Sequence, residues 1–395
     1  MRCVGTVSRG IRTPIIKAND DLATIVVDSL LKAKENEHFE FKDRDVVAIT
    51  EAVVAISENN YATVDDIAED IKRKFPSGDI GILNPILSRN RFSILLKGIA
   101  RGCKHLTIQL SFPSDEVGND ILEEEKLYAQ GFNTADVISE EQYKKYFNDF
   151  LHPFTGINMV DFYRKVVESE DCKVDFVLAN DINTILDYNK DVLVCNIHTR
   201  AKNKRILKAS GGQTIFGLDD ILSESINGSG YNPKYGLLGS NKTTEEKVKL
   251  FPREGQKIVD KVHEILKEKT GKNIEVMVYG DGGFKDPVGG IWELADPVVS
   301  PAYTSGLEGT PNELKLKYLS DNKFKDLRGD ELKAALINEI KNKDKDLKGT
   351  MQTQGTTPRR LTDLIGSLCD LTSGSGDKGT PVVFIQGYFD NLASE

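Results

Sequence analysis

Two segments near the N-terminus, residues 10–31 and 43–61, constrain the fold of this chain more than any other stretch. In the first, a polar loop carrying Asp20 and Asp21 leads into an amphipathic pattern, so either aspartate can cap a helix. In the second, the β-branched and apolar residues at 46–56 predict a strand buried on both faces. A capped helix next to a buried strand indicates a layered protein in which helices pack on a sheet.

Helical and strand patterns alternate along most of the 395 residues, and this alternation predicts a mixed α/β (α+β) fold. A chain of this length can form two domains. We place the boundary near residue 236, between an N-terminal region, 1–235, and a C-terminal region, 236–395. Residues 75–235 of the first region are predicted to be an insertion that contains βαβ units.

Composition excludes several classes of protein. The formal net charge of −9 argues against a general affinity for nucleic acids or anionic membranes. The five cysteines are scattered without a CxxC pair, so we expect neither a disulfide framework nor a structural zinc site. The N-terminus lacks the apolar core of a signal peptide, and no apolar run approaches the ~18 residues of a membrane span. We therefore expect a cytoplasmic protein that acts on a small phosphorylated ligand.

The best-formed local unit is a predicted βαβ unit at 78–119, whose helix opens with Ser88, Arg89, Asn90 and Arg91. Backbone N–H groups at a helix N-terminus, together with two guanidinium groups, would hold a phosphate or a carboxylate. We therefore assign Arg89 and Arg91 to catalysis, and Ser88 and Asn90 to nucleotide or substrate binding. The alternative is a capped helix with surface salt bridges, which is the commoner situation.

Asp115 and Glu116 follow the second strand of the same unit. A pair of carboxylates can hold Mg²⁺ or Mn²⁺. Because the two strands of a βαβ unit are parallel, both loops are expected to converge at one edge of the sheet.

A second candidate site lies at 278–290. Asp281 directly follows a predicted buried strand and is flanked by glycines, which let the backbone approach a ligand closely. Asp286, Glu293 and Asp296 add carboxylate oxygens within a short stretch. A carboxylate at the end of a strand is a common catalytic or metal-binding position. The alternative is a glycine-rich hairpin with solvated acids.

Arg359 and Arg360 lie at the start of the last predicted helix, where Thr357 could be the N-cap and Pro358 the first helical residue. Basic residues there oppose the helix dipole, which favours a role in binding a phosphate or a substrate carboxylate. The alternative is a pair of solvated surface arginines. The chain contains no GxxxxGK[ST] pattern, so any nucleotide site must use a fold other than a P-loop.

Three blocks of the chain, 10–61, 236–290 and 361–387, resemble the ligases that add γ-linked glutamate to coenzyme F-420. The second block contains GLLGSN and VYGDGG, and the third ends in GTPVVFIQG. The resemblance implies a two-domain α/β protein that forms an intertwined homodimer. It also implies GTP with Mg²⁺ or Mn²⁺ as cofactors, a carboxylate that becomes activated, and glutamate whose amine forms the amide.

Several positions of the family pattern carry over to this chain. Glu58 is retained after the early strand, and Ser240 and Asn241 match the GLLGSN motif. Asp281 corresponds to the aspartate of the family's next motif. At three positions the chain departs from the pattern, because Asn19 stands where the family has a glycine, Ile56 where it has a lysine and Leu238 where it has a metal-binding aspartate.

The function predicted from the sequence is a GTP- or ATP-dependent ligase that joins an amino acid to a small-molecule carboxylate. Asp281, Asp115 and Glu116 are the expected metal ligands. The departures at Ile56 and Leu238 motivate an alternative, a small-molecule or nucleotide-binding protein without catalysis on the same scaffold. A metal-dependent phosphohydrolase that uses the same acids is a third possibility.

Overall fold

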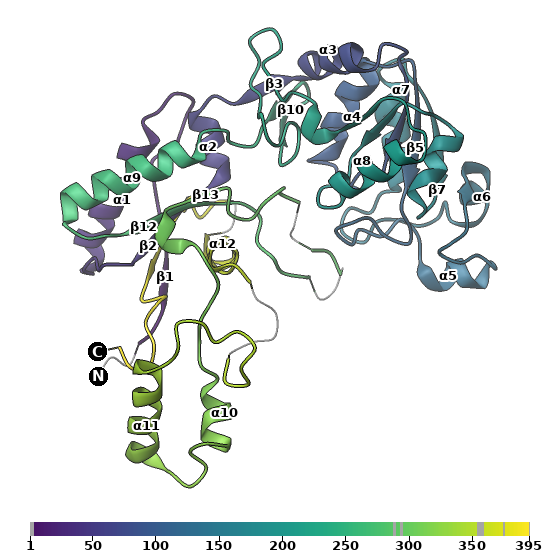
Figure 1. Cartoon of the computed structure of the whole chain (residues 1–395). Helices are drawn as coiled ribbons and strands as arrows, with labels where there is room; N and C mark the ends of the chain where they lie inside the picture. The colour runs from purple at the N-terminus through teal and green to yellow at the C-terminus, as the bar shows by residue number, and fades with distance from the viewer. Residues whose placement is uncertain (1–3, 287–289, 293–294, 354–358, 374–375, 395) are drawn as a thin grey trace.

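The computed structural model describes residues 4–286, 290–292, 295–353, 359–373 and 376–394. Its strands form three sheets with helices packed against them, which confirms the predicted α/β fold. Figure 1 shows two bodies, one built on a five-stranded sheet that includes β1, β2 and β12, the other on a six-stranded sheet that includes β5 and β7. A helical pair, α10 (Leu316–Asp321) and α11 (Gly329–Lys341), extends away from both sheets.

The five-stranded sheet joins distant parts of the chain in the order β1-β14-β2-β12-β13. Its central strands β2 and β12 are parallel, and its other neighbouring strands are antiparallel. Strands from both sides of residue 236 take part, and the predicted division into two regions stays a prediction. The bounds are β1 (Val7–Ile11), β14 (Val382–Gln386), β2 (Val46–Thr50), β12 (Glu275–Tyr279) and β13 (Ala302–Tyr303).

Helices cover both faces of this sheet. On β2, Val47 and Ile49 face a core shared with α1 (Leu22–Glu37) and α9 (Gly255–Thr270). The alternate residues of β2 face α12 (Leu361–Ser373) on the other side. A strand buried on both faces carries apolar residues without a polar alternation, as this one does.

The six-stranded sheet has the order β6-β7-β5-β4-β8-β9, and only β6 is antiparallel to its neighbour. Of these six strands, β4 comes first in the chain and lies in the middle of the sheet. The connections therefore run outward in both directions, as in doubly wound α/β domains. The bounds are β4 (Asp79–Leu83), β5 (His105–Leu110), β6 (Ile138–Ser139), β7 (Lys173–Leu178), β8 (Val192–Val194) and β9 (Ile215–Gly217).

One face of the six-stranded sheet packs on three helices and the opposite face on two. The first set is α3 (Val64–Lys74), α4 (Phe92–Arg101) and α7 (Met159–Glu168), and the second is η1 (Ile182–Asp187) and α8 (Arg200–Ala209). The remaining short helices are α2 (Glu51–Ser57), α5 (Glu124–Ala129), α6 (Glu140–Tyr146), η2 (Leu218–Asp220) and η3 (Ser305–Leu307).

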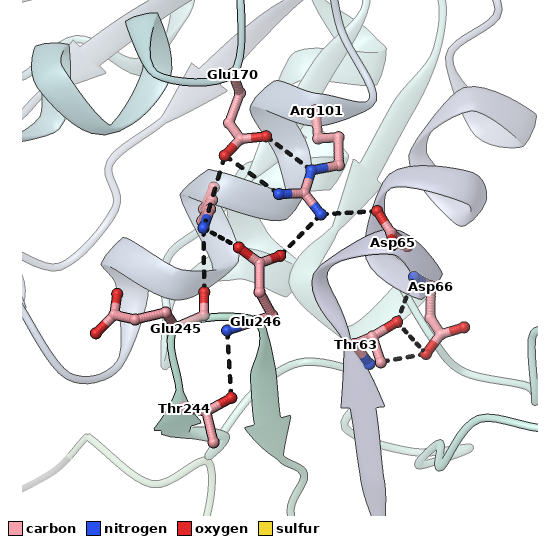
Figure 2. A network of polar contacts seen from close by, with 9 residues as sticks. Thr63, Asp65, Asp66, Arg101, Glu170, Thr244, Glu245 and Glu246 are labelled. Atoms are coloured by element: carbon pink, nitrogen blue, oxygen red, sulfur yellow. Dashed lines mark hydrogen bonds and ion pairs between the residues drawn. The ribbon is translucent and has the colours of Figure 1, made fainter.

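A small antiparallel sheet of β10 (Asn241–Thr244), β11 (Lys247–Lys249) and β3 (Tyr61–Thr63) is attached to α4 by ion pairs. Figure 2 shows this network, in which the Arg101 guanidinium contacts Glu170 at 2.7 Å and Glu246 at 2.9 Å. Asp65, at the start of α3, lies 2.7 Å from the same group. The network anchors the β10–β11 turn and thereby the position of Lys249 at the end of β11.

Two helix N-termini carry clear local sequence signals. Asp21 caps α1 by accepting a hydrogen bond from the Thr24 N–H, and Thr63 forms a capping box with Asp66 at α3. The predicted strand at 46–56 is wrong in its second half, because the chain turns into α2 at Glu51. An apolar run of this length fits either element, and the Glu51 carboxylate, bound by Lys249, ends the strand.

Membrane-spanning helices and disulfide bonds are both absent from the described part of the chain. None of its helices is long and apolar enough to cross a membrane. Its four cysteines, Cys103, Cys172, Cys195 and Cys369, are free thiols. Cys3 lies outside the described residues.

Candidate functional site

Acidic residues gather at one edge of the five-stranded sheet, where β2 and β12 end. These strands are parallel and Tyr279 lies opposite Thr50, so their carboxyl ends meet. Glu51 directly follows β2, and Asp281 comes two residues after the end of β12. The sheet register therefore brings together two carboxylates that are 230 positions apart in the sequence.

Arg91 reaches this edge from the other body of the molecule. One nitrogen of its guanidinium donates to Asp281 at 2.6 Å and another to Asp296 at 2.8 Å. Asp296 is only 3% exposed, and its second oxygen accepts a hydrogen bond from the Asp281 N–H at 2.8 Å. The planar fork of an arginine suits such a double contact and fixes the two carboxylates relative to each other.

The loop before α4 holds Arg91 in place. Ser88 Oγ accepts hydrogen bonds from the Asn90 and Arg91 N–H groups, at 3.3 and 3.1 Å. Arg91 itself occupies the position just before α4. Arg91, which the sequence assigns to catalysis, thus lies at this edge of the sheet, and its two partners belong to the C-terminal part of the chain.

A buried ion pair and a further acid complete the site. Lys249 Nζ lies 2.9 and 2.8 Å from the two oxygens of Glu51, and both residues are buried. Asp370, on α12, accepts a hydrogen bond from the Gly282 N–H at 3.0 Å. We refer to six residues as the edge cluster: Glu51, Arg91, Lys249, Asp281, Asp296 and Asp370.

Burial and neighbouring charges shift the pKa of three groups of the edge cluster, Glu51, Asp370 and Arg91. Burial raises the pKa of Glu51, and Asp296 adds to this effect while Lys249 opposes it. Burial likewise raises the pKa of Asp370, with a smaller contribution from Asp296. Burial disfavours the charged form of Arg91, but Asp296 and Asp281 outweigh it and raise the pKa of Arg91 above its usual value. Because acidic groups outnumber basic ones, the cluster favours a ligand that brings positive charge with it, as an anion with a bound cation does.

The two loops of the predicted βαβ unit do converge, because the Leu87 N–H donates to Asp115 at 2.8 Å. Asp115 also accepts hydrogen bonds from the Val117 and Asn119 N–H groups and from the Asn119 side chain. Glu116 accepts from the N–H groups of Ile197, His198 and Thr199 at the start of α8. Both acids thus satisfy backbone donors, and we leave them out of the proposed site.

The other predicted binding residues lie in several places. Asp20 accepts from the Lys17 N–H, Asp21 caps α1, and Glu58 accepts from the Arg253 and Glu254 N–H groups. Ser240 is buried and donates to the Leu237 carbonyl, and Asn241 begins β10. Exposed side chains of this set are Arg89 and Asn90 before α4, and Arg359 and Arg360 before α12. Glu293, Thr357 and Pro358 lie outside the described residues.

The side chains of the edge cluster differ in their arrangement from the ligands of a metal site. Among the described residues, no group of three or more His, Cys, Asp or Glu side chains is arranged to hold a metal ion. Asp281, the expected ligand, is paired with Arg91. In this arrangement the described residues do not fit a metal centre held by the protein alone.

Comparison with known proteins identifies the family of the chain. The sequence model of the F420-0:gamma-glutamyl ligase family matches residues 10–387. The chain belongs to this family. The resemblance predicted from the sequence is thereby confirmed, and the match spans the six-stranded sheet as well as the three blocks that suggested it. No curated protein matches the chain.

Two of the chain's departures from the family pattern, Ile56 and Leu238, lie in apolar cores. Leu238 is buried within the apolar core of the six-stranded body, and Ile56 packs partly buried against the core around α1. Both side chains therefore have a packing role. The basic groups of the edge cluster come instead from Arg91 and Lys249.

Sequence reasoning missed Glu51, Lys249 and Asp370. The sequence places Glu51 inside the strand predicted at 46–56. A charged residue within that apolar run was the signal that could have indicated the end of the strand and a site residue. Lys249 pairs with a residue 198 positions away and Asp370 contacts a glycine 88 positions away. No local pattern indicates either contact.

Gly280 gives a test of the geometry. A Cβ atom at this position would lie 2.4 Å from Asp296 Oδ2, so Gly280→Ala must displace Asp296 from Arg91 and from the Asp281 N–H. We expect turnover to fall roughly 10²-fold, because misplacing a site group by about 1 Å has such an effect. Steady-state kinetics would measure it. Gly5→Ala, which meets no heavy atom within 4 Å, is the matched control; equal turnover in both variants would contradict a role for Asp296.

Proposed function

We propose that this chain is a nucleotide-dependent ligase that joins an amino acid, glutamate first among the candidates, to a carboxylate of a small molecule. Membership in the F420-0:gamma-glutamyl ligase family supports γ-glutamyl bond formation. The observation that carries the proposal is the contact of Arg91 with both Asp281 and Asp296 at the carboxyl ends of β2 and β12. GTP or ATP, with Mg²⁺ or Mn²⁺, is the proposed source of the activating phosphoryl group.

The edge cluster supplies groups that such a reaction needs. Transfer of a phosphoryl group to a carboxylate develops negative charge, and fixed cations stabilise it. Arg91 is fixed by its two carboxylates, so it is held in position before the substrate binds. The amine then attacks the acyl phosphate, the C–N bond forms, and phosphate leaves with the electrons of the C–O bond. Asp370, whose pKa burial raises, stands at the rim of the cluster as an acceptor for the amine's proton.

A divalent cation would enter this scheme bound to the nucleotide phosphates, where it neutralises their charge. We assign no step to a metal ion held by the protein alone. The family resemblance also supports two further proposals, a homodimer and a cytoplasmic location.

The decisive experiment measures phosphate release and amide formation with GTP or ATP, Mg²⁺ or Mn²⁺, coenzyme F420-0 and L-glutamate. We expect release that depends on glutamate, with stoichiometric amide. In Asp281→Ala we expect both to fall roughly 10²-fold or more, because one partner of the Arg91 fork is lost. Asp296 still binds Arg91 in that variant, so we expect circular dichroism to show an intact fold.

Other results would overturn the proposal in distinct ways. Phosphate release that is independent of any amine would identify a phosphohydrolase. Nucleotide binding without release would identify a binding protein on the same scaffold. Full activity in Asp281→Ala would remove Asp281 from the mechanism.

A further inference from the structure

A hollow of about 1130 Å³ lies beside the edge strand β1, apart from the edge cluster. Its walls are β1 with the loop that follows it, one side of α1, Thr372 near the end of α12, and Lys378 and Thr380 near the start of β14. A volume of this size accommodates a nucleotide or a coenzyme.

The walls of this hollow carry an excess of positive charge, whereas the whole chain has a net charge of −9. Arg12, Lys32 and Lys378 line it, are exposed, and form no ion pair with any other described residue. Two acids also line it, Asp28, which is paired with Lys269 at 3.3 Å, and Glu37, so basic residues outnumber acidic ones four to two when Arg9 is included. Three unpaired cations around one concave surface attract an anion.

A polar atom without a partner lines the same hollow. The Oγ1 atom of Thr380 is buried and forms no hydrogen bond in the structure. Thr380 is close to the β1 backbone, since a Cβ atom at Gly10 would lie 3.1 Å from its side chain. Buried hydroxyl groups are nearly always hydrogen-bonded, and a bound ligand can supply the hydrogen-bond partner that this hydroxyl lacks.

One part of the wall, at Thr380, lies at the same edge of the sheet as the edge cluster. Thr380 comes just before β14, whose first residue, Val382, pairs with Ile11 at the end of β1. The Thr50 N–H, at the end of β2, donates to the Pro381 carbonyl at 2.9 Å. Since neighbouring strands lie about 4.8 Å apart, two strand spacings separate the end of β1 from the end of β2. An elongated substrate can therefore reach from the hollow to Glu51.

We propose that this hollow binds a phosphate group of a substrate, with Arg12, Lys32, Lys378 and Thr380 as its contacts. The substrate's reacting end then extends along the sheet edge to the edge cluster. The phosphate belongs either to the nucleotide or to the molecule whose carboxylate is activated. This inference rests on the proposed ligase function for the identity of those substrates, and not for the binding itself.

The test compares binding in the full chain by calorimetry, with GTP–Mg²⁺ in one series and coenzyme F420-0 in another. Lys32→Ala/Lys378→Ala should weaken binding of one of them at least about tenfold, and added salt should reduce the difference from the unsubstituted protein. The matched control is Lys202→Ala/Lys208→Ala on α8, where both side chains are exposed. It should bind as the unsubstituted protein does.

Weaker binding of GTP alone would assign the hollow to the nucleotide, and weaker binding of F420-0 alone would assign it to the acceptor molecule. Unchanged binding of GTP and of F420-0 in the double variant would overturn the inference. So would an unsubstituted protein that binds neither of these two ligands. If binding is weakened but no amide forms in any condition, the hollow is a phosphate site and the ligase proposal fails. If amide forms and neither KM changes in the double variant, the ligase proposal holds and this inference fails.

Discussion

Arg91→Met is expected to slow amide formation by roughly 10²–10³-fold and to destabilise the protein, the largest combined effect of any single substitution in the edge cluster. The guanidinium is the cation shared by Asp281 and Asp296, and Asp296 is only 3% exposed. Removing it leaves a buried carboxylate without a counter-charge. Breaking a buried pair in this way lowers the free energy of unfolding by about 3–5 kcal/mol.

The effect on turnover has a separate cause. In the proposed reaction, Arg91 stabilises negative charge on the transferring phosphoryl group, and loss of one such group reduces the rate by roughly 10²–10³-fold. Thermal unfolding and amide formation would therefore be measured on the same preparation. The rate should be determined well below the melting temperature of the variant, so that unfolding does not contribute to the loss.

Two further substitutions separate charge from geometry at this position. Arg91→Lys keeps the charge, but a single ammonium group cannot reproduce the two parallel contacts of the fork. It should recover much of the stability and little of the rate. Arg205→Ala, an exposed arginine on α8, is the matched control and should behave as the unsubstituted protein. Normal turnover in Arg91→Met would exclude Arg91 from the mechanism.

Lys249→Met is expected to have the second largest effect, mainly on stability. The Lys249 side chain is the counter-charge of Glu51, and the two side chains are 9% and 7% exposed. The variant leaves the Glu51 carboxyl buried without its counter-charge, so that it must either stay charged in an apolar place or take up a proton. We expect the free energy of unfolding to fall by about 3–5 kcal/mol, measured by denaturant titration.

The pH dependence gives this prediction a clear sign. Burial raises the pKa of Glu51 in the folded state, and the loss of Lys249 raises that pKa further. An acid whose pKa is higher in the folded than in the unfolded state destabilises the protein above the folded-state pKa. This destabilisation is lost as the pH falls from the folded-state pKa towards the unfolded-state pKa. The difference between Lys249→Met and the unsubstituted protein should therefore shrink between neutral pH and about pH 5.

A double variant tests the same explanation independently of pH. Lys249→Met/Glu51→Leu replaces both charges with apolar groups, which is often neutral or stabilising for a buried pair. It should be more stable than Lys249→Met alone. If Glu51→Leu brings no recovery, the loss in Lys249→Met comes from packing rather than from the unpaired carboxylate.

Both predictions concern contacts between distant parts of the chain. Arg91 belongs to the loop before α4 of the six-stranded body, whereas Asp281 and Asp296 follow β12 of the five-stranded sheet. The site is therefore assembled from both bodies shown in Figure 1. This arrangement explains why one substitution is expected to affect stability and catalysis together.

The sequence by itself determined the features that depend on neighbouring residues. Asp21 caps α1 and Thr63 caps α3 through bonds to residues three positions further on. The apolar strand before Asp281 and the polar loop before α4 were likewise readable, because burial and turns leave local patterns. The family could be recognised from short blocks at both ends of the chain.

The tertiary structure alone decided which of these groups meet. Arg91 and Asp281 are 190 positions apart, and Lys249 and Glu51 are 198 apart. Their contact depends on strand order and register, which residue spacing does not encode. The same limit applies to Asp115 and Glu116, where a sequence cannot distinguish a carboxylate free for a ligand from one that binds backbone N–H groups of another loop. Hydrogen bonds within one turn follow from local geometry, whereas long-range ion pairs form only after the sheets have brought their partners together.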